Sequence, residues 1–245
     1  STLPAATFLL TSCSGEVSGL GFEEGVSSVN DQSLSLWQGA WIAAAVVGIF
    51  TLILILWPVF FHRKKDESFP KQTQYNIPVE VAYTVIPFVI VAVLFYFTVQ
   101  RESKIVKITP DAQVSHFIDV VGFQWSWQFK YREAGDYKSA TVTGTPAQPP
   151  TLYLPQGQKV RFTLDANDVV HGFWIPAFMI QMQNLPGVTN KLEFTANKLG
   201  TYPGRCNILC GRNHSQMLFS VKVVTLAEYE KYLQDLVAEE KAGLA

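Results

Sequence analysis

The sequence predicts a two-helix transmembrane hairpin followed by an all-β domain of the Greek-key type and a C-terminal helix. Two long apolar runs without charges come early in the chain, and each has about the 20 residues with which a helix spans a hydrocarbon core. Short alternating segments follow and predict strands. With 245 residues, 48% of them apolar and 16% charged, the chain can form one globular domain and a membrane anchor. The formal net charge of −1 gives no indication of nucleic-acid binding.

The N-terminal segment, residues 1–36, holds acidic residues but no Lys or Arg. Within it, Leu10-Thr11-Ser12-Cys13 has the Leu-small-small-Cys pattern of a lipobox, after which bacterial lipoprotein signals are cut and the cysteine is acylated. No initiator Met or basic region precedes it, so the start of such a signal is missing. Cys13 is predicted to be lipidated, with an unmodified thiol as the alternative. Three cysteines exclude a disulfide framework.

The predicted transmembrane helices cover residues 37–61 and 77–100. No charged side chain occurs in residues 41–61 or 81–99, and each run contains one proline, which membrane helices tolerate with a kink. The alternative is a pair of buried helices in a soluble protein.

Loop charge predicts the orientation of the hairpin. The connecting loop, residues 62–76, contains several basic residues, namely Arg63, Lys64, Lys65 and Lys71. The positive-inside rule therefore places this loop in the cytoplasm. Arg101, Lys104 and Lys107 oppose this weakly, but large domains cross the membrane largely regardless of charge. We expect a multi-pass protein of the bacterial cell membrane with its N-terminus and β domain on the outer face.

Residues 105–225 are expected to form the β domain. Segments such as 158–164 and 218–224 alternate polar and apolar side chains, while the proline-rich stretch 145–155 indicates a loop or an edge. Residues 226–243 then carry apolar residues at helical spacing between Glu and Lys. This pattern predicts an amphipathic C-terminal helix that packs on the β domain or on a partner.

The most specific motif is a short loop near the end of the β domain. It holds Cys206, Cys210, His214 and Met217, and a further histidine, His171, lies upstream. Thiolate, imidazole and thioether groups together suit a soft metal, and copper fits this set best. Zinc also binds Cys and His but does not explain Met217. The remaining alternative is a buried loop with free thiols.

Two cysteines indicate more than one copper ion, because a blue copper site needs only one. Cys206 and Cys210 can bridge two copper ions, leaving one histidine for each metal, with Met217 and a backbone carbonyl as weak outer ligands. This is the dinuclear arrangement called CuA. It suits electron transfer, since one electron is shared over two metals and two sulfurs and little rearranges when it arrives or leaves.

On these residues the chain resembles subunit II of haem–copper cytochrome c oxidases. The family pattern C-x-x-x-C-x-x-x-H-x-x-M, with an earlier histidine, matches residues 206–217 and His171. The resemblance implies a cupredoxin barrel with the metal loop between its last two strands. It also implies that Ile208 binds copper through its carbonyl oxygen.

The resemblance implies further roles outside the loop. Trp125 matches the tryptophan through which electrons from cytochrome c reach the copper, whereas Trp127 is expected in the core. Asp165 and Asp168 match or neighbour acidic residues that dock the donor, whose lysines favour opposite charge. Glu80 lies where the family has a glutamate at the mouth of the K proton channel.

The implied function is to accept electrons from a c-type cytochrome at CuA and pass them to haem a of subunit I. Oxygen is reduced to water there, with proton pumping, in a complex that also contains subunit III. Residues 69–78 and the lipobox resemble actinobacterial subunits, so a membrane-bound cytochrome held in a supercomplex is a candidate donor. This chain alone is expected to have no oxidase activity, because it lacks a Cys-x-x-Cys-His haem motif and its spans contain no histidine.

One departure from the family concerns magnesium. Many members have Glu where this chain has Ile208, and Lys and Asp where it has Gln181 and Gln183. A hydrocarbon side chain cannot bind a hard cation, which puts a magnesium contribution in doubt. Two other functions remain as alternatives, a copper-free quinol oxidase subunit and a nitrous-oxide-reductase-type or stand-alone copper protein. The filled copper positions disfavour the first, and the hairpin without a second catalytic domain disfavours the second.

Overall fold

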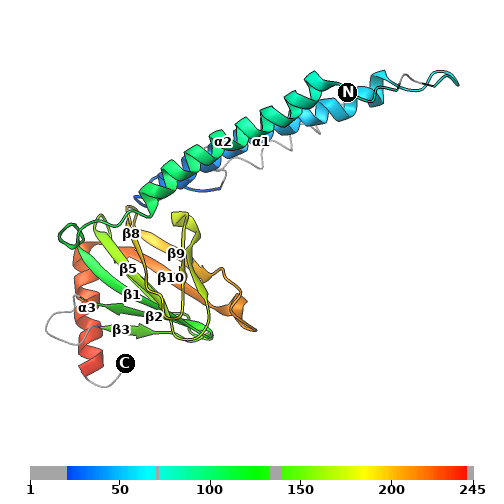
Figure 1. Ribbon diagram of the computed structural model, residues 1–245. Coiled ribbons are helices and arrows are strands. Elements are labelled where there is room, and N and C mark those ends of the chain that lie inside the picture. The colour runs from blue at the N-terminus through cyan, green and yellow to red at the C-terminus, as the bar shows by residue number, and fades with distance from the viewer. Residues whose placement is uncertain (1–20, 70–71, 133–139, 242–245) are drawn as a thin grey trace, which may run out of the picture. The chain divides into compact units, whose positions relative to one another are not determined.

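The computed structural model describes residues 21–69, 72–132 and 140–241, which form two compact units (Figure 1). One unit is helical and consists of residues 35–102. The other contains the β domain together with the described residues before 35 and after 102. Cys13 lies outside the described residues, so its predicted lipidation stays a prediction.

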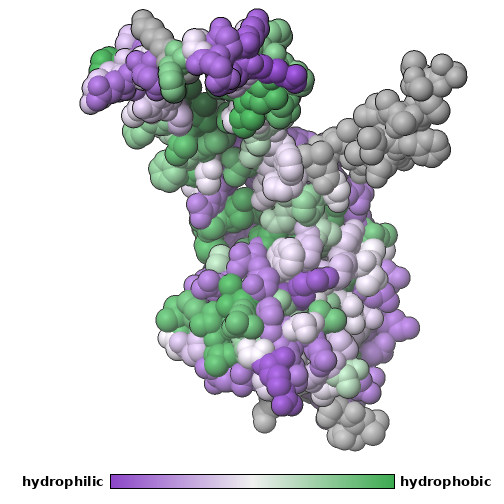
Figure 2. All heavy atoms as spheres, turned by 90° about the vertical axis from the view of Figure 1, so that its right-hand side faces the viewer, coloured by the Kyte–Doolittle hydropathy of each residue, from purple (hydrophilic) through white to green (hydrophobic). Residues whose placement is uncertain are grey.

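The helical unit consists of most of α1 (Asn30–Phe61) and α2 (Ile77–Ile105). Within the described part of the chain these are the two helices long and apolar enough to cross a membrane, with hydropathies of 2.6 and 2.2. In each helix, no residue of the most apolar 18-residue segment is buried. Figure 2 shows hydrophobic residues along the helices and hydrophilic residues at the end of the hairpin. The described part of the chain therefore does not bury these helices, as the alternative of a soluble protein would require.

The β domain contains two sheets, which in the described residues have five strands each. The first has the order β3-β2-β1-β5-β8 and the second β4-β10-β9-β6-β7. The strands of the first sheet are β1 (His116–Phe123), β2 (Ser126–Tyr131), β3 (Thr141–Thr143), β5 (Lys159–Ala166) and β8 (Asn190–Thr195). Those of the second are β4 (Thr151–Pro155), β6 (His171–Ile175), β7 (Ile180–Asn184), β9 (Gly200–Cys206) and β10 (Leu218–Val224).

Strand pairing identifies the type of sandwich. The pairs β1–β5 and β4–β10 are parallel, while the other pairs are antiparallel. Parallel neighbours need crossover connections, which here run between the sheets. The result is a cupredoxin-like domain that follows two apolar helices in the sequence, and the predicted fold class is confirmed.

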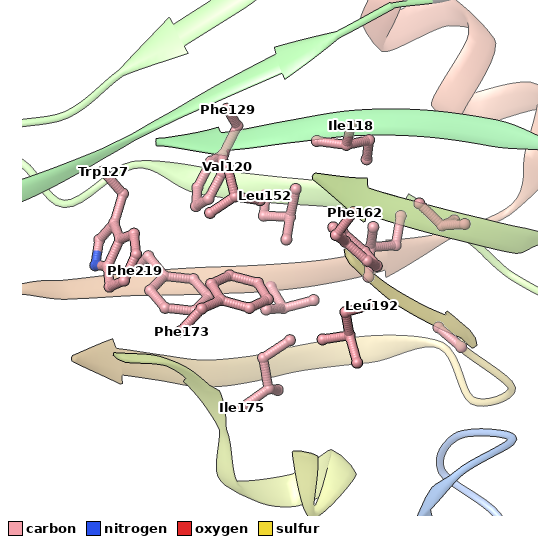
Figure 3. Close-up of a cluster of buried hydrophobic side chains, with 14 of the residues drawn as sticks. Ile118, Val120, Trp127, Phe129, Leu152, Phe162, Phe173, Ile175, Leu192 and Phe219 are labelled. Carbon is pink, nitrogen blue, oxygen red and sulfur yellow. The ribbon is translucent and has the colours of Figure 1, made fainter. Parts of the chain in front are cut away.

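The core between the sheets combines aliphatic side chains with a layer of aromatic rings (Figure 3). Phe173 and Phe219 stack with ring centroids 5.0 Å apart, and Trp127 meets Phe219 edge-on at 5.4 Å. Phe162 adds a ring from the other sheet, 5.9 Å from Phe173. All four side chains are buried, as expected for Trp127. Removing one such ring typically costs about 3–5 kcal/mol, so this layer gives rigid support to the loops at the end of the barrel.

The residues just before α1 pair with the C-terminal end of the edge strand β8 and with the residues that follow it. Ser28 N donates to Thr195 O at 2.9 Å, Thr195 N donates to Ser28 Oγ at 3.0 Å, and Ser27 forms a bridge with Ala196. Val26 is buried in the barrel core. Covering an edge strand removes unpaired backbone groups that would otherwise pair with other chains.

The segment after α2 is fixed by a buried ion pair. Arg161 on β5 donates to Glu193 on β8 at 2.6 Å and also pairs with Asp111 in the short helix η3 (Asp111–Gln113). Glu193 accepts a hydrogen bond from Thr109 N at 3.1 Å. Both partners of the Arg161–Glu193 pair are buried, where breaking such a pair typically costs about 3–5 kcal/mol.

The C-terminal helix α3 (Leu226–Lys241) packs on the barrel. Thr225 and Glu228 form a reciprocal cap, in which Thr225 N donates to Glu228 Oε2 at 3.0 Å and Glu228 N donates to Thr225 Oγ1 at 3.3 Å. Tyr229 and Leu233 lie one helical turn apart, and the side chains of both belong to the core. The predicted amphipathic helix therefore buries its apolar face on its own domain.

Candidate metal centre

The Cys/His/Met loop lies where β9 ends and β10 begins. Cys206 is the last residue of β9, and its amide donates to Met217 O at 3.0 Å, which closes the base of the loop. Cys210 lies within the loop, and the short helix η5 (His214–Gln216) leads back to β10. Cys206, Cys210 and Met217 are all buried. The loop connects the last two strands, as the resemblance implied.

The potential ligand atoms of the loop converge. The Sγ atoms of Cys206 and Cys210 are 3.8 Å apart. Cys210 Sγ lies 3.5 Å from His214 Nδ1 and 3.7 Å from Met217 Sδ. The carbonyl oxygen of Ile208 is 3.2 Å from Cys206 Sγ. Every ligand predicted from the loop therefore faces the same small volume.

His171 reaches this volume from the neighbouring strand β6. The ligand atoms of His171, Cys206 and Cys210 all lie within 4.8 Å of one another. His171 Nε2 is 2.8 Å from Asp168 Oδ1, whereas Nδ1 is buried and has no hydrogen-bond partner among the described residues. A carboxylate on Nε2 favours the tautomer with its proton there, which leaves the Nδ1 lone pair for a metal.

Asp168 connects three parts of the site. Besides its contact with His171, its Oδ2 accepts a hydrogen bond from Gln124 N at 2.7 Å, and its Oδ1 accepts one from Val169 N at 2.6 Å. Burial raises the pKa of Asp168, but these hydrogen bonds outweigh it and hold the pKa below its usual value. Asp168 is therefore an ionised anchor for His171.

Two glycines make room for the site. A Cβ on Gly122 of β1 would come within 2.9 Å of the His171 ring. A Cβ on Gly172 would lie 2.0 Å from Asn207 Oδ1 and 2.7 Å from the Ile208 side chain. The His171 ring can lie this close to β1, and the metal loop this close to β6, only because neither Gly122 nor Gly172 has a side chain.

The pKa values of the Cys206 and Cys210 thiols are shifted in opposite directions. Burial raises the pKa of Cys206, but the neighbouring His171 and the hydrogen bond from Gly172 N outweigh it and lower the pKa below its usual value. Burial and the charge of Cys206 raise the pKa of Cys210. Two buried thiolates 3.8 Å apart repel each other, so a cation bound between them is needed to hold both in the ionised form.

Trp125 lies beside the loop. Its Nε1 donates to Cys210 O at 3.2 Å, and Gln124 Nε2 donates to the same oxygen at 2.9 Å. The Trp125 side chain is half-buried. It therefore connects the backbone of a cysteine ligand with the surface, although donor contact stays a prediction.

The other predicted site residues lie apart from the convergent ligands. Asp165 Oδ1 accepts a hydrogen bond from Thr189 Oγ1 at 2.7 Å. Gln181 and Gln183 are exposed on β7. In the helical unit, Glu80 Oε1 accepts a hydrogen bond from Asn76 N at 2.9 Å and so caps the start of α2. The roles of Asp165 in docking and of Glu80 in proton uptake stay predictions.

Sequence reasoning missed Asn184, which pairs with His171 across β6 and β7. Its buried Nδ2 donates to Val120 O and to Asp165 O, each at 2.9 Å. It thereby ties β7 to β1 and β5 beside the site. No local sequence pattern marks this asparagine. A signal was present for a different feature: Gly172, directly after His171, could have indicated that the metal loop approaches β6 closely.

The donor set fits copper. Two buried thiols, a histidine nitrogen without a partner, a second histidine, a thioether and a carbonyl oxygen converge. Soft sulfur and imidazole ligands select copper or zinc, and a buried methionine beside them favours copper. Ile208 offers only its backbone to a cation.

The family model and the sequence relatives of this chain agree on one family. The family model described as "Cytochrome C oxidase subunit II, periplasmic domain" matches residues 116–224. A probable cytochrome c oxidase subunit 2 of Streptomyces coelicolor is 42% identical over 86% of this chain and 76% of that protein. Cytochrome c oxidase subunit 2 of Mycobacterium tuberculosis is 32% identical over 96% of this chain and 80% of that protein. The crystal structure of the periplasmic domain of cytochrome oxidase subunit II from Bradyrhizobium japonicum has 25% identity and a TM-score of 0.48, covering 56% of this chain and 100% of that domain.

Proposed function

Because this chain belongs to the cytochrome c oxidase subunit II family, we propose that it receives electrons for a haem–copper terminal oxidase at a dinuclear CuA site. The single observation that carries the proposal is the convergence of His171, Cys206 and Cys210 within 4.8 Å, next to His214 and Met217. The actinobacterial relatives agree with the resemblance found in the sequence.

We assign the ligands as follows. The thiolates of Cys206 and Cys210 and the Nδ1 atoms of His171 and His214 would hold the copper ions, and Met217 Sδ and the carbonyl oxygen of Ile208 would complete the ligand set. When bound, the copper pair supplies a one-electron redox centre. The protein holds its donor atoms in a buried volume supported by the aromatic core, so the ligands need little rearrangement between redox states and water is excluded.

Electrons enter through Trp125 in this proposal. Its indole lies one hydrogen bond from the carbonyl of Cys210 and remains partly exposed, which supports a short route from the surface to the thiolate. Asp165 and Asp168 contribute negative charge that steers a cationic c-type cytochrome. Asp168 then has a second role, because the same carboxylate orients His171.

We further propose the complex that the family implies. Electrons pass from this subunit to haem a of subunit I, where oxygen is reduced to water with proton pumping, and subunit III completes the assembly. We propose that the donor is a membrane-bound c-type cytochrome in a supercomplex, as expected from the actinobacterial resemblance. The subunit itself reduces no oxygen, and a magnesium ion receives no ligand from the Ile208 side chain.

Membrane topology completes the proposal. Segments 37–61 and 77–100 of the two apolar helices span the bacterial cell membrane, loop 62–76 faces the cytoplasm, and residues 1–36 and the copper domain lie on the outer face. Glu80 is then at the cytoplasmic end of α2, which supports its assignment to the mouth of the K proton channel. In the structure its carboxylate also caps that helix.

The first test is the copper content and electron paramagnetic resonance spectrum of the full chain in detergent. Two copper ions per chain and a seven-line hyperfine pattern are expected, because one electron is shared by two copper nuclei. Cys206→Ser and Cys210→Ser should each abolish that pattern, whereas Ser126→Ala at a buried position outside the ligand set should retain it. A four-line spectrum, or zinc in place of copper, would refute the dinuclear assignment.

A further inference from the structure

A groove lies between α1 and α2, within the helical unit. Its volume is about 300 Å³, at the lower end of the range of about 300–1,000 Å³ for small-molecule sites. Gly39 and Ala40 of α1 and Val93 and Phe97 of α2 line its apolar part. Ser35 and Arg101 line the end remote from the connecting loop, since they lie near the start of α1 and the end of α2.

The small residues of α1 leave the groove open. A Cβ built on Gly39 meets no heavy atom within 4 Å. The surrounding side chains are those of helices long and apolar enough to cross a membrane. In a bilayer, a groove of this kind is filled by an apolar chain of the surrounding lipid rather than by water.

Arg101 gives the groove a polar end at headgroup depth. The apolar run of α2 ends at Val99 and is followed by the uncharged Gln100, so Arg101 is the first cation at the boundary of the apolar span. An arginine presents five N–H donors in a planar fork that matches phosphate, and it can bind a phosphate while keeping another partner. The positive-inside rule does not account for a cation on this side of the hairpin.

We propose that this groove binds an anionic phospholipid, with an acyl chain between Gly39 and Phe97 and the phosphate on Arg101. An anionic headgroup fits better than a zwitterionic one, because the latter carries its own cation next to the phosphate and Arg101 repels it. The inference requires the hairpin to lie in a bilayer but is independent of the copper assignment.

The test is the lipid content of the intact oxidase complex after exchange into detergent, with phosphatidylglycerol as the anionic probe. Mass spectrometry of the extracted lipid should show one fewer phosphatidylglycerol per complex in Arg101→Gln than in the wild type. The matched control is Arg63→Gln in the connecting loop, which removes the same charge at the other end of the hairpin and should leave the count unchanged. An unchanged count in Arg101→Gln, or an equal loss in both variants, would overturn the proposal.

Two further variants separate the groove from the charge. Gly39→Leu fills the groove without removing a charge and should also lose the bound lipid, whereas Arg101→Lys should keep most of it. Size-exclusion chromatography of each variant reports whether the complex is intact. If a variant does not assemble, the same comparison is made on the full chain in bilayer discs of phosphatidylglycerol or phosphatidylcholine, and equal retention of both lipids would refute the anionic site. Lipid bound to the isolated chain but absent from the wild-type complex would mean that a partner helix occupies the groove, and would also refute it.

Discussion

Asp168 and His171 form a directed pair, in which Oδ1 of the carboxylate lies 2.8 Å from Nε2 of the ring while Nδ1 faces the cysteines without a partner among the described residues. The pair leaves Nδ1 as the ring nitrogen that is available to a metal. It also gives Asp168 a role at the site that is separate from any contact with an electron donor.

Replacing Asp168 by Ala should weaken copper binding about 10- to 100-fold, as is typical when the hydrogen-bond partner of a metal-binding histidine is removed. Asp168→Asn should lose less, because its amide oxygen can still accept the proton of Nε2. Chelator competition on the full chain measures the affinity. Asp165→Ala is the control and should leave copper affinity unchanged, since Asp165 contacts Thr189 rather than His171. Equal affinities for Asp168→Ala and the wild type would contradict the anchoring role.

Trp125→Phe should keep copper but slow the oxidation of the donor. The Cys210 carbonyl retains its hydrogen bond from Gln124 Nε2, so the loop should hold its conformation. We expect a rate reduction of about tenfold, equivalent to about 1.4 kcal/mol in activation free energy. Stopped-flow reduction of the oxidase by its cytochrome measures it. Trp174→Phe, on β6, is the control, and normal kinetics in Trp125→Phe would contradict the assignment.

Gly122→Ala should disturb the site directly. The new Cβ would come within 2.9 Å of the His171 ring, and overpacking of this kind costs about 1–3 kcal/mol. Both the unfolding temperature and the copper affinity should fall. Gly157→Ala separates the two effects, because Gly157 has a positive φ of 74° and open space around it, so that its substitution strains the backbone without contacting a ligand. A loss of copper affinity in both variants would argue against a direct clash.

Alkaline pH should destabilise the β domain through Tyr131. Burial raises the pKa of this fully buried phenol well above its usual value, and the neighbouring Tyr232 raises it further. The unfolded chain therefore releases the proton at a lower pH than the folded chain. Stability should be fully present below the usual tyrosine pKa and fall as the pH rises above it.

The pH dependence can be checked by denaturant unfolding of the full chain across the alkaline range. Tyr131→Phe should flatten the decline, at a cost of about 1–3 kcal/mol near neutral pH because Tyr153 N loses its acceptor. Tyr75→Phe, on an exposed loop residue, should follow the wild-type curve. A decline of equal slope in Tyr131→Phe would show that other groups cause it.

Much of this architecture follows from local sequence patterns. The uncharged runs predict α1 and α2, and the spacing of Cys206, Cys210, His214 and Met217 predicts that one loop carries these side chains. The hydrogen bond between Asp168 and His171 could not be predicted in this way, because it depends on the conformation of the loop before β6. Asn184 was missed because its partners, Val120 and Asp165, belong to other strands.

The contacts of the N-terminal segment were even less predictable from local sequence patterns. Its acidic composition predicted an extracytoplasmic segment, but nothing local indicated that Val26 enters the barrel core or that Ser28 pairs with Thr195. Contacts over such separations depend on the finished sheet, whose edge is exposed only after the strands have assembled.

The contact of residues 26–28 with β8 makes this fold self-complementing. A fragment that begins after α2 would contain every proposed copper ligand but would lack the segment that pairs with the end of β8, and the position of Val26 in its core would be vacant. Such a fragment has the form of a receptor for an added strand. A peptide of residues 22–34 supplied in trans should bind it by β-augmentation, and without that peptide the exposed edge is where two fragments would pair with each other.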